Sequence, residues 1–190
     1  SSASALRQIE RGFDAVRLHI LPMAHEGDVF EPRIAIAHTA EACIDARKSL
    51  GESVFLGLDF HHRLNVSEAI SFVSKLPPGT LDFLEEPIRC ESLDAYRALA
   101  AHCDIPLAIG EEFITKWQFQ PFVESGLLGF ARIDLANAAG LTEGMKVAGW
   151  CEARYIDAMP PDPLGAANTA ATLHFAAAVP RCARLEARQH

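Results

Sequence analysis

Long apolar runs and paired cysteines are both missing from this sequence. No stretch approaches the roughly 20 consecutive apolar residues that a membrane-spanning helix needs, and the N-terminus carries no basic and apolar signal pattern. The cysteines are odd in number, scattered and never spaced as CxxC; they are Cys43, Cys90, Cys103, Cys151 and Cys182. We therefore expect reduced and mostly buried thiols, no membrane partner and a cytoplasmic location.

Positive charge is also scarce. The formal net charge is -8 and the sequence pI is about 5.4, so nucleic acid and anionic membrane surfaces would be repelled. The sequence also lacks a glycine-rich phosphate loop, a nucleophile elbow and a cysteine–histidine pair. These absences leave a small molecule as the expected partner.

Apolar residues, in contrast, make up 49% of the 190 residues, enough for one domain, residues 1–190, with a sizeable core. Short apolar or alternating segments predict strands over 13–20, 54–60, 81–87, 106–112, 130–135, 155–159 and 183–187. Helical patterns separate them, including one that Ser67 is predicted to cap. Strands that alternate with helices indicate an α/β fold with parallel strands and right-handed crossovers.

Two α/β architectures are open at this point. A closed barrel of the TIM type has eight strands, so it requires at least one strand missing before the first predicted one, whereas an open doubly wound sheet requires none. Acidic residues end most of the predicted strands; they are Asp59, Glu85, Glu111, Asp134 and Glu186. A doubly wound sheet gathers ligands only at its switch point, but all strand ends of a barrel converge on one mouth. The acidic pattern therefore favours the barrel.

Three of these acids, Asp59, Glu85 and Glu111, end successive predicted strands. Neighbouring parallel strands lie about 4.8 Å apart, so the three carboxylates would share a small space. Like charges this close raise one another's pKa unless a cation lies among them. Carboxylate oxygens suit a hard divalent ion, and an open site suits Mg²⁺ better than zinc. We therefore predict a magnesium site.

Five segments in the same order resemble one known family: GLDFHHR, FLEEP, AIGEEF, RIDLANAAGLTE and MPPDPLGAANTAATLHFAAAVP. They are similar to the barrel domain of the enolase superfamily, within it the mandelate racemase and muconate lactonizing subgroup, and there the galactonate dehydratase type of sugar-acid dehydratase. The resemblance runs from about Gly12 to Glu186. It implies an incomplete parallel (β/α) barrel of the TIM type, with strands 2–8 present and the first strand and an N-terminal capping domain absent. It also implies Mg²⁺ on Asp59, Glu85 and Glu111, and a homo-oligomer.

The chemistry implied by the resemblance is abstraction of the proton α to a carboxylate, through a metal-stabilised enediolate, followed by loss of water from a hydroxy-carboxylate such as an aldonic acid. His61 matches the general acid, and Glu186 matches a residue that binds the substrate or the enediolate. Asp134 matches the aspartate that orients a base histidine. Pro161 stands where that histidine is expected, and proline can neither accept nor relay a proton.

The missing base leaves alternatives. His19 on the first predicted strand is a candidate base, with Arg17 lowering its pKa, and the protein would then be a racemase, epimerase or cycloisomerase. Asp162 is a weaker candidate, since a Pro-Asp-Pro turn better explains it. A third alternative is a metal-binding homologue without catalysis. We expect His62 to point away from the site and Glu86 to face out of the barrel or into its rim. The long loop 21–33 is a candidate active-site flap.

Overall fold

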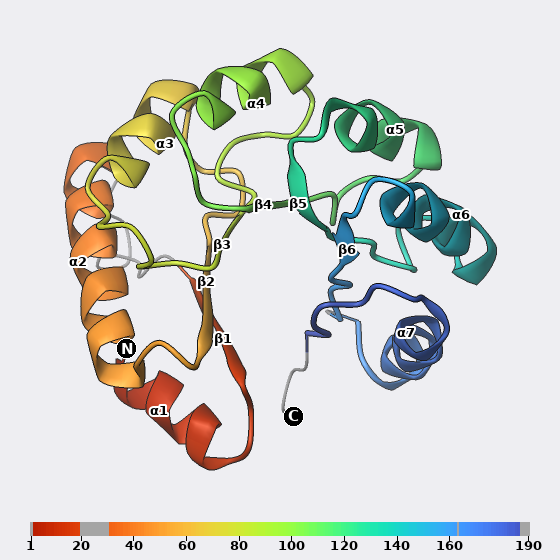
Figure 1. Cartoon of the computed structure of the whole chain (residues 1–190), viewed down its shortest axis with the longest axis horizontal. Coiled ribbons are helices and arrows are strands. Elements are labelled where there is room, and N and C mark those ends of the chain that lie inside the picture. The colour runs from red at the N-terminus through yellow and green to blue at the C-terminus, as the bar shows by residue number, and fades with distance from the viewer. Residues whose placement is uncertain (1, 20–30, 163, 187–190) are drawn as a thin grey trace. The chain divides into compact units, whose positions relative to one another are not determined.

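A computed structural model describes residues 2–19, 31–162 and 164–186 of the chain (Figure 1). The chain divides into two compact units, residues 1–106 and 107–190. Strands and helices alternate in both units, which confirms the predicted α/β class. Most of the predicted flap, residues 21–30, lies outside the described residues.

The first unit begins with a helix and then repeats strand and helix three times. Its elements are α1 (Ser2–Glu10), β1 (Ala15–His19), α2 (Pro32–Leu50), β2 (Phe55–Asp59), α3 (Val66–Val73), β3 (Phe83–Glu85) and α4 (Leu93–Ala100). The three strands are parallel, and their register places His19 opposite Asp59 and Asp59 opposite Glu85. The carboxyl ends of the strands therefore form one row of polar residues.

Local signals explain where the helices of this unit begin. Pro32 occupies the first turn of α2, where a missing N–H costs nothing. The prediction that Ser67 caps α3 is wrong: the cap is Asn65, whose side chain accepts from the N–H of Glu68 while the Glu68 side chain accepts from the N–H of Asn65. Ser92 caps α4 through the N–H of Ala95. Figure 1 shows α2 and α3 along the same side of β1–β3.

Close packing fixes the centre of the first unit. Gly57 faces Phe83 across the β2–β3 pair, and a Cβ atom at Gly57 would lie 2.0 Å from the Phe83 ring. Only glycine fits there, and the Phe83 ring stacks on Phe55 with centroids 5.3 Å apart. Phe60 and Phe72 are fully buried and meet edge to face. This packing holds β2 and β3 in the register that aligns their polar ends.

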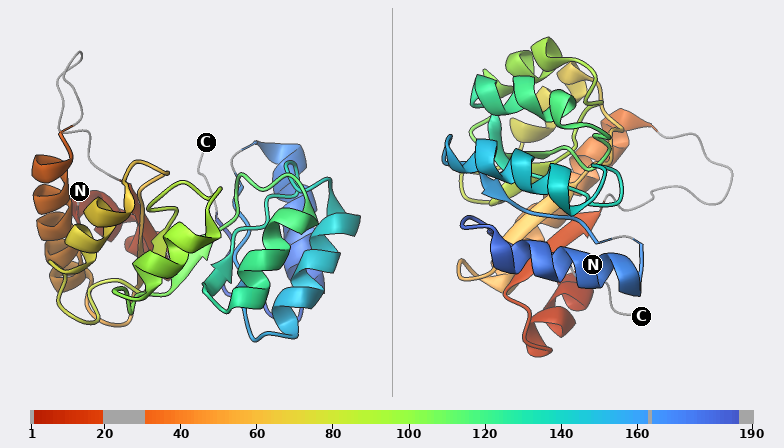
Figure 2. Two further views of the ribbon diagram at one scale, coloured as in Figure 1. Left: turned by 90° about the horizontal axis from the view of Figure 1, so that it is seen from above. Right: turned by 90° about the vertical axis from the view of Figure 1, so that its right-hand side faces the viewer.

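The second unit contains β4 (Leu107–Ile109), α5 (Lys116–Ser125), β5 (Leu128–Ala131), α6 (Leu141–Glu152), β6 (Asp157–Ala158) and α7 (Ala166–Ala178). The pairs β4–β5 and β5–β6 are parallel. Figure 2 shows α6 packed between α5 and α7. The strands are shorter than predicted, so Glu111 and Asp134 lie in the segments that follow β4 and β5 rather than within them.

The last predicted strand, 183–187, is wrong as an element. Its described part, residues 183–186, contains no strand, and an isolated bridge joins Ala158 to Cys182, just before the segment. Main-chain hydrogen bonds nevertheless run alongside β6, from Ala183 to Ala158 and from Glu186 to the carbonyl of Pro160. Glu186 is therefore held beside the end of β6, as a strand residue would be.

Two further features were predicted from the sequence: the state of the cysteines and the lack of membrane-spanning helices. All five cysteines are free; three are buried, and burial raises the pKa of Cys43 and of Cys151 to about 12. This agrees with the prediction of mostly buried thiols. Among the described residues, no helix combines the length and the apolar character that crossing a bilayer requires.

Candidate active site

The first unit gathers two buried carboxylates at the carboxyl ends of adjacent strands. Asp59 ends β2 and Glu85 ends β3, and the two are register partners. Asp59 is 2% exposed and Glu85 is 0% exposed. Ionised carboxylates in such surroundings require compensating charge or hydrogen-bond donors.

Arg17 on β1 supplies that charge. Its Nη1 donates to Oε1 of Glu85 at 2.7 Å and lies 3.9 Å from Oδ2 of Asp59. The Arg17 side chain is 15% exposed. The sequence predicted Arg17 as a partner of His19, and Nη2 lies 3.4 Å from Nε2 of that ring. Its contact with the carboxylates was not predicted.

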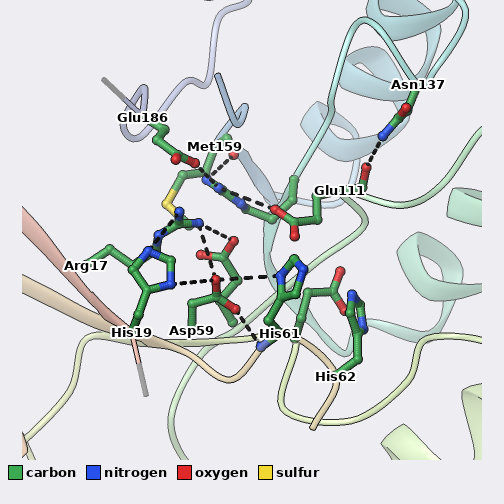
Figure 3. Close-up of polar contacts among 12 residues, drawn as sticks. Arg17, His19, Asp59, His61, His62, Glu111, Asn137, Met159 and Glu186 are labelled. Carbon is green, nitrogen blue, oxygen red and sulfur yellow. Dashed lines mark hydrogen bonds and ion pairs between the residues drawn. The ribbon is translucent and has the colours of Figure 1, made fainter. Parts of the chain in front are cut away.

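Two histidine rings approach Asp59 from different sides (Figure 3). Nδ1 of His19 lies 3.2 Å from Oδ2 of Asp59, and Nδ1 of His61 lies 3.9 Å from the same oxygen. The His61 main-chain N–H donates to Oδ1 at 2.7 Å. Burial alone would raise the pKa of Asp59, but the hydrogen bond with His19 and the charge of Arg17 outweigh it, so that pKa lies below its usual value. Both rings are more than half exposed.

His61 faces Asp59 for a different reason from the one predicted. The prediction relied on strand alternation, but β2 ends at Asp59, and both His61 and His62 have left-handed backbones with φ of 49° and 64°. In this turn the His61 side chain lies at the surface, whereas the His62 side chain points into the interior and is 8% exposed. His61 and His62 therefore point in different directions, as predicted. The left-handed turn produces this difference, and not the alternation of side chains along a strand.

Glu86 was predicted to face out of the barrel or into its rim, and its side chain contacts Tyr96 of α4, the helix that follows β3. The side chain is fully buried, with Oε2 3.6 Å from Nδ1 of His62 and 3.2 Å from the donating hydroxyl of Tyr96. The same hydroxyl lies 2.7 Å from the carbonyl of Ile88. Burial and the nearby charge of Glu86 raise the pKa of Tyr96 well above its usual value. Glu86 itself has a φ of 35°, so it leaves the strand direction immediately after Glu85.

The second unit contains a comparable cluster around Arg132, a residue that no sequence pattern marked as part of a site. Nη2 of Arg132 donates to Oε2 of Glu186 at 2.6 Å and lies 3.9 Å from Oε2 of Glu111. Nη1 donates to the carbonyl of Met159 at 2.9 Å, and Asn137 donates to the carbonyl of Glu111 (Figure 3). Arg132 is 2% exposed. The two predicted site residues Glu111 and Glu186 are thus brought together by an arginine.

Asp134 is buried in the turn after β5 and accepts the N–H of Ala136 at 2.9 Å. Burial raises its pKa above the usual range; the hydrogen bonds and Arg132 oppose this shift, and Asp162 adds to it. The predicted role of Asp134 in orienting a base is not tested by these contacts.

Pro161 and Asp162 lie buried after β6. The Asp162 carboxylate accepts from the side chains of Asn168 at 3.1 Å and Thr169 at 2.5 Å, both in the first turn of α7. Asp162 therefore ties the proline-rich segment to the helix, a structural role that leaves its oxygens engaged. The proposal that Pro161 replaces a base histidine stays a prediction.

The donor chemistry of the first unit fits a hard divalent ion. Asp59 and Glu85 offer carboxylate oxygens only, and a guanidinium already binds both, which shows that the pair accepts a cation. Because Glu111 belongs to the second unit, the three-carboxylate ligand set stays a prediction.

Comparison with known proteins agrees with this architecture. Residues 1–189 match a family model described as Enolase C-terminal domain-like. The chain is 33% identical over 164 residues to a D-galactonate dehydratase of Ralstonia nicotianae, and 33% identical over 163 residues to one of Klebsiella pneumoniae. Each match covers 86% of this chain and 42% of the relative, so the matched region spans less than half of their length.

A solved structure shows the same fold. A mandelate racemase/muconate lactonizing enzyme-like protein from Roseovarius sp. TM1035 superposes with a TM-score of 0.90 at 27% identity, over 100% of this chain and 48% of that one. The predicted barrel, incomplete in this chain, is therefore confirmed at the level of the fold. Together with the family match, this shows that the chain belongs to the Enolase C-terminal domain-like family of the enolase superfamily.

Proposed function

We propose that this protein is a Mg²⁺-dependent acid-sugar dehydratase, a carbon–oxygen lyase that removes the proton α to the carboxylate of a hydroxy-carboxylate substrate. The observation that carries the proposal is the row of polar strand ends in the first unit, where two buried carboxylates lie beside two exposed histidines. The relatives named D-galactonate dehydratase support an aldonic acid as the substrate class.

In this proposal Asp59, Glu85 and Glu111 hold the metal. A bound Mg²⁺ supplies positive charge to the substrate carboxylate, which acidifies the neighbouring C–H bond. The lowered pKa of Asp59 keeps that carboxylate ionised at neutral pH, as a metal ligand must be. Glu186, held by Arg132, is proposed to bind the substrate.

His61 is the proposed general acid for the departing β-hydroxide. Its ring is 59% exposed and lies 3.9 Å from Asp59, so a substrate can reach it beside the carboxylate pair. The base is assigned to His19, because Pro161 cannot take a proton. The 3.2 Å contact between Nδ1 of His19 and Asp59 fixes the ring, as a carboxylate fixes a catalytic histidine in other enzymes.

The contact between His19 and Asp59 also favours a second candidate function. If His19 removes the α-proton, His61 does not expel hydroxide and a proton returns to the opposite face of the same carbon, the substrate is racemised or epimerised instead of dehydrated. Cycloisomerisation belongs to the same class. A metal-binding homologue without catalysis is the third candidate. A homo-oligomer and a cytoplasmic location remain part of the proposal.

The test uses the full-length protein with Mg²⁺, a panel of aldonic acids and D₂O. Formation of a keto acid with one water lost supports the dehydratase, and exchange of the α-proton without loss of water supports the racemase. Mg²⁺ binding with neither reaction on any acid of the panel leaves the non-catalytic homologue.

A pair of histidine variants sharpens the result. His61→Gln is expected to abolish dehydration but to keep α-proton exchange, since the acid acts after the base. His174→Gln, at an exposed position on α7, is the matched control and is expected to retain both reactions. Equal loss of exchange and dehydration in His61→Gln contradicts the assignment of His61 as the acid.

A further inference from the structure

The Arg17 guanidinium contacts the buried carboxylates of both Asp59 and Glu85. Arg17 reaches Oε1 of Glu85 at 2.7 Å and Oδ2 of Asp59 at 3.9 Å through the same nitrogen, Nη1. The carboxylates are 0% and 2% exposed, so water solvates neither well. Arg17 thus supplies the nearby positive charge that two adjacent buried anions require.

A divalent ion at these carboxylates would need the oxygens that Arg17 now faces. Like charges repel strongly where water is excluded, so a guanidinium and a metal ion are not both favoured at the same pair of anions. Arg17 lies on β1 with 15% of its side chain exposed, so it is closer to solvent than the two carboxylates, which are 0% and 2% exposed. The rest of its long side chain can stay packed while the charged end moves.

We propose that Arg17 is an internal counter-ion that stabilises Asp59 and Glu85 without metal and that Mg²⁺ must displace to bind. The proposal rests on the proposed function, because it takes Asp59 and Glu85 as metal ligands. The two cations compete for the same carboxylates, so Arg17 lowers the affinity for Mg²⁺ and stabilises the metal-free fold. Mg²⁺ affinity is then set partly by a residue that does not bind the metal.

The decisive variant is Arg17→Met in the full-length protein, with Mg²⁺ affinity measured by calorimetric titration and thermal unfolding followed in EDTA and in saturating Mg²⁺. We expect the variant to bind Mg²⁺ about tenfold more tightly, within the usual range of coupling between ligands. We also expect its melting temperature to fall in EDTA and to recover in Mg²⁺. Arg17→Lys keeps the charge, so its Mg²⁺ affinity and its melting temperature in EDTA should lie between those of Arg17→Met and the parent. It replaces Arg17→Met in the test if that variant does not fold.

Arg47→Met is the matched control. Arg47 is 13% exposed and donates to Asp82 at 2.6 Å, at the opposite end of the β2–β3 pair, where it also binds the carbonyl of Val54. Its loss should lower the melting temperature equally in EDTA and in Mg²⁺ and leave the affinity for Mg²⁺ unchanged.

The outcomes separate this inference from the proposed function. Unchanged or weaker Mg²⁺ binding by Arg17→Met, with normal binding by the parent, overturns the competition and leaves the metal site standing. Binding by the variant but not by the parent supports competition in its strongest form. Absence of binding by both proteins overturns the metal site and the inference together.

Discussion

Each compact unit contains one arginine between two acidic side chains, yet the two arginines are held differently. Arg17 is 15% exposed and donates to Glu85 from the edge of the carboxylate pair. Arg132 is 2% exposed, donates to Glu186 through one nitrogen, and binds the carbonyl of Met159 through another.

Arg17 is therefore a counter-ion that can be displaced, whereas Arg132 is a counter-ion that is held in place. Main-chain carbonyls cannot move without moving the loop, so Arg132 fixes the end of β6 and the segment that carries Glu186. Arg17 can leave its carboxylates if another cation takes its place. An arginine between two acids can therefore be displaceable in one unit and fixed in the other.

The largest effect should come from Arg132→Met. Removing one partner of a buried ion pair leaves an uncompensated charge, and the expected loss in the free energy of unfolding is about 3 kcal/mol. Denaturant unfolding should show the same loss in EDTA and in Mg²⁺. If Mg²⁺ restores the stability of this variant, a metal ion can replace Arg132 as well as Arg17, and the two arginines do not differ in this respect.

The next largest effect should be a loss of Mg²⁺ affinity when a proposed ligand is replaced. Glu85→Gln should weaken Mg²⁺ binding by at least about tenfold, because changes near a metal site commonly cost 10- to 100-fold. Glu186→Gln removes an acid of the second unit that is not one of the three proposed ligands, so it should weaken Mg²⁺ binding less than Glu85→Gln does. Calorimetric titration of both variants checks the pair, and equal weakening would show that the two clusters do not differ in this way.

Smaller losses in the free energy of unfolding should follow when a hydroxyl that donates to a buried carboxylate is removed from each unit. Tyr96→Phe removes the donor to buried Glu86, and Thr169→Val removes the donor to buried Asp162. Each should cost about 1–3 kcal/mol of unfolding free energy, since each carboxylate keeps its burial and loses a partner. Chemical unfolding measures both. A loss in neither variant would mean that water replaces the donors.

The row of polar strand ends in the first unit was predictable because parallel strands place corresponding ends together. Asp59 and Glu85 end short apolar runs, and their pairing follows from that pattern alone. The family resemblance added roles that no pattern of spacing provides. The α/β class and most of the helices were predictable for the same reason, since helical and strand periodicities alternate along the chain.

The parts that could not be predicted depend on distant partners or on unusual backbone angles. Arg132 lies in an apolar run, and its role depends on Glu186, 54 residues further along the chain. Nothing in the sequence marks His62 or Glu86 as left-handed, because neither is glycine. Both side chains are largely buried, Glu86 against Tyr96 of α4. Asn65 replaced Ser67 as a cap because Glu68 completes a reciprocal pair with it.

The smallest predicted effect concerns pH and Asp134. Burial raises the pKa of Asp134 despite the nearby charge of Arg132, whereas Arg17 and His19 lower that of Asp59 in the first unit. The folded protein therefore keeps the Asp134 proton to higher pH than the unfolded chain, whose aspartate pKa is about 3.9. Stability is lost as pH rises from that value through the folded pKa, and the loss stays constant above it.

Asp134→Asn does not titrate, so it escapes this loss while its side-chain oxygen can still accept the Ala136 N–H. In EDTA the variant should equal the parent in stability near pH 3 and exceed it at pH 7, as measured by denaturant unfolding across that range. An advantage that instead appears only at low pH would mean that Asp134 is stabilised as an anion. Arg132 would then neutralise Asp134 as well as Glu186, and the second cluster would resemble the first, where one guanidinium serves two carboxylates.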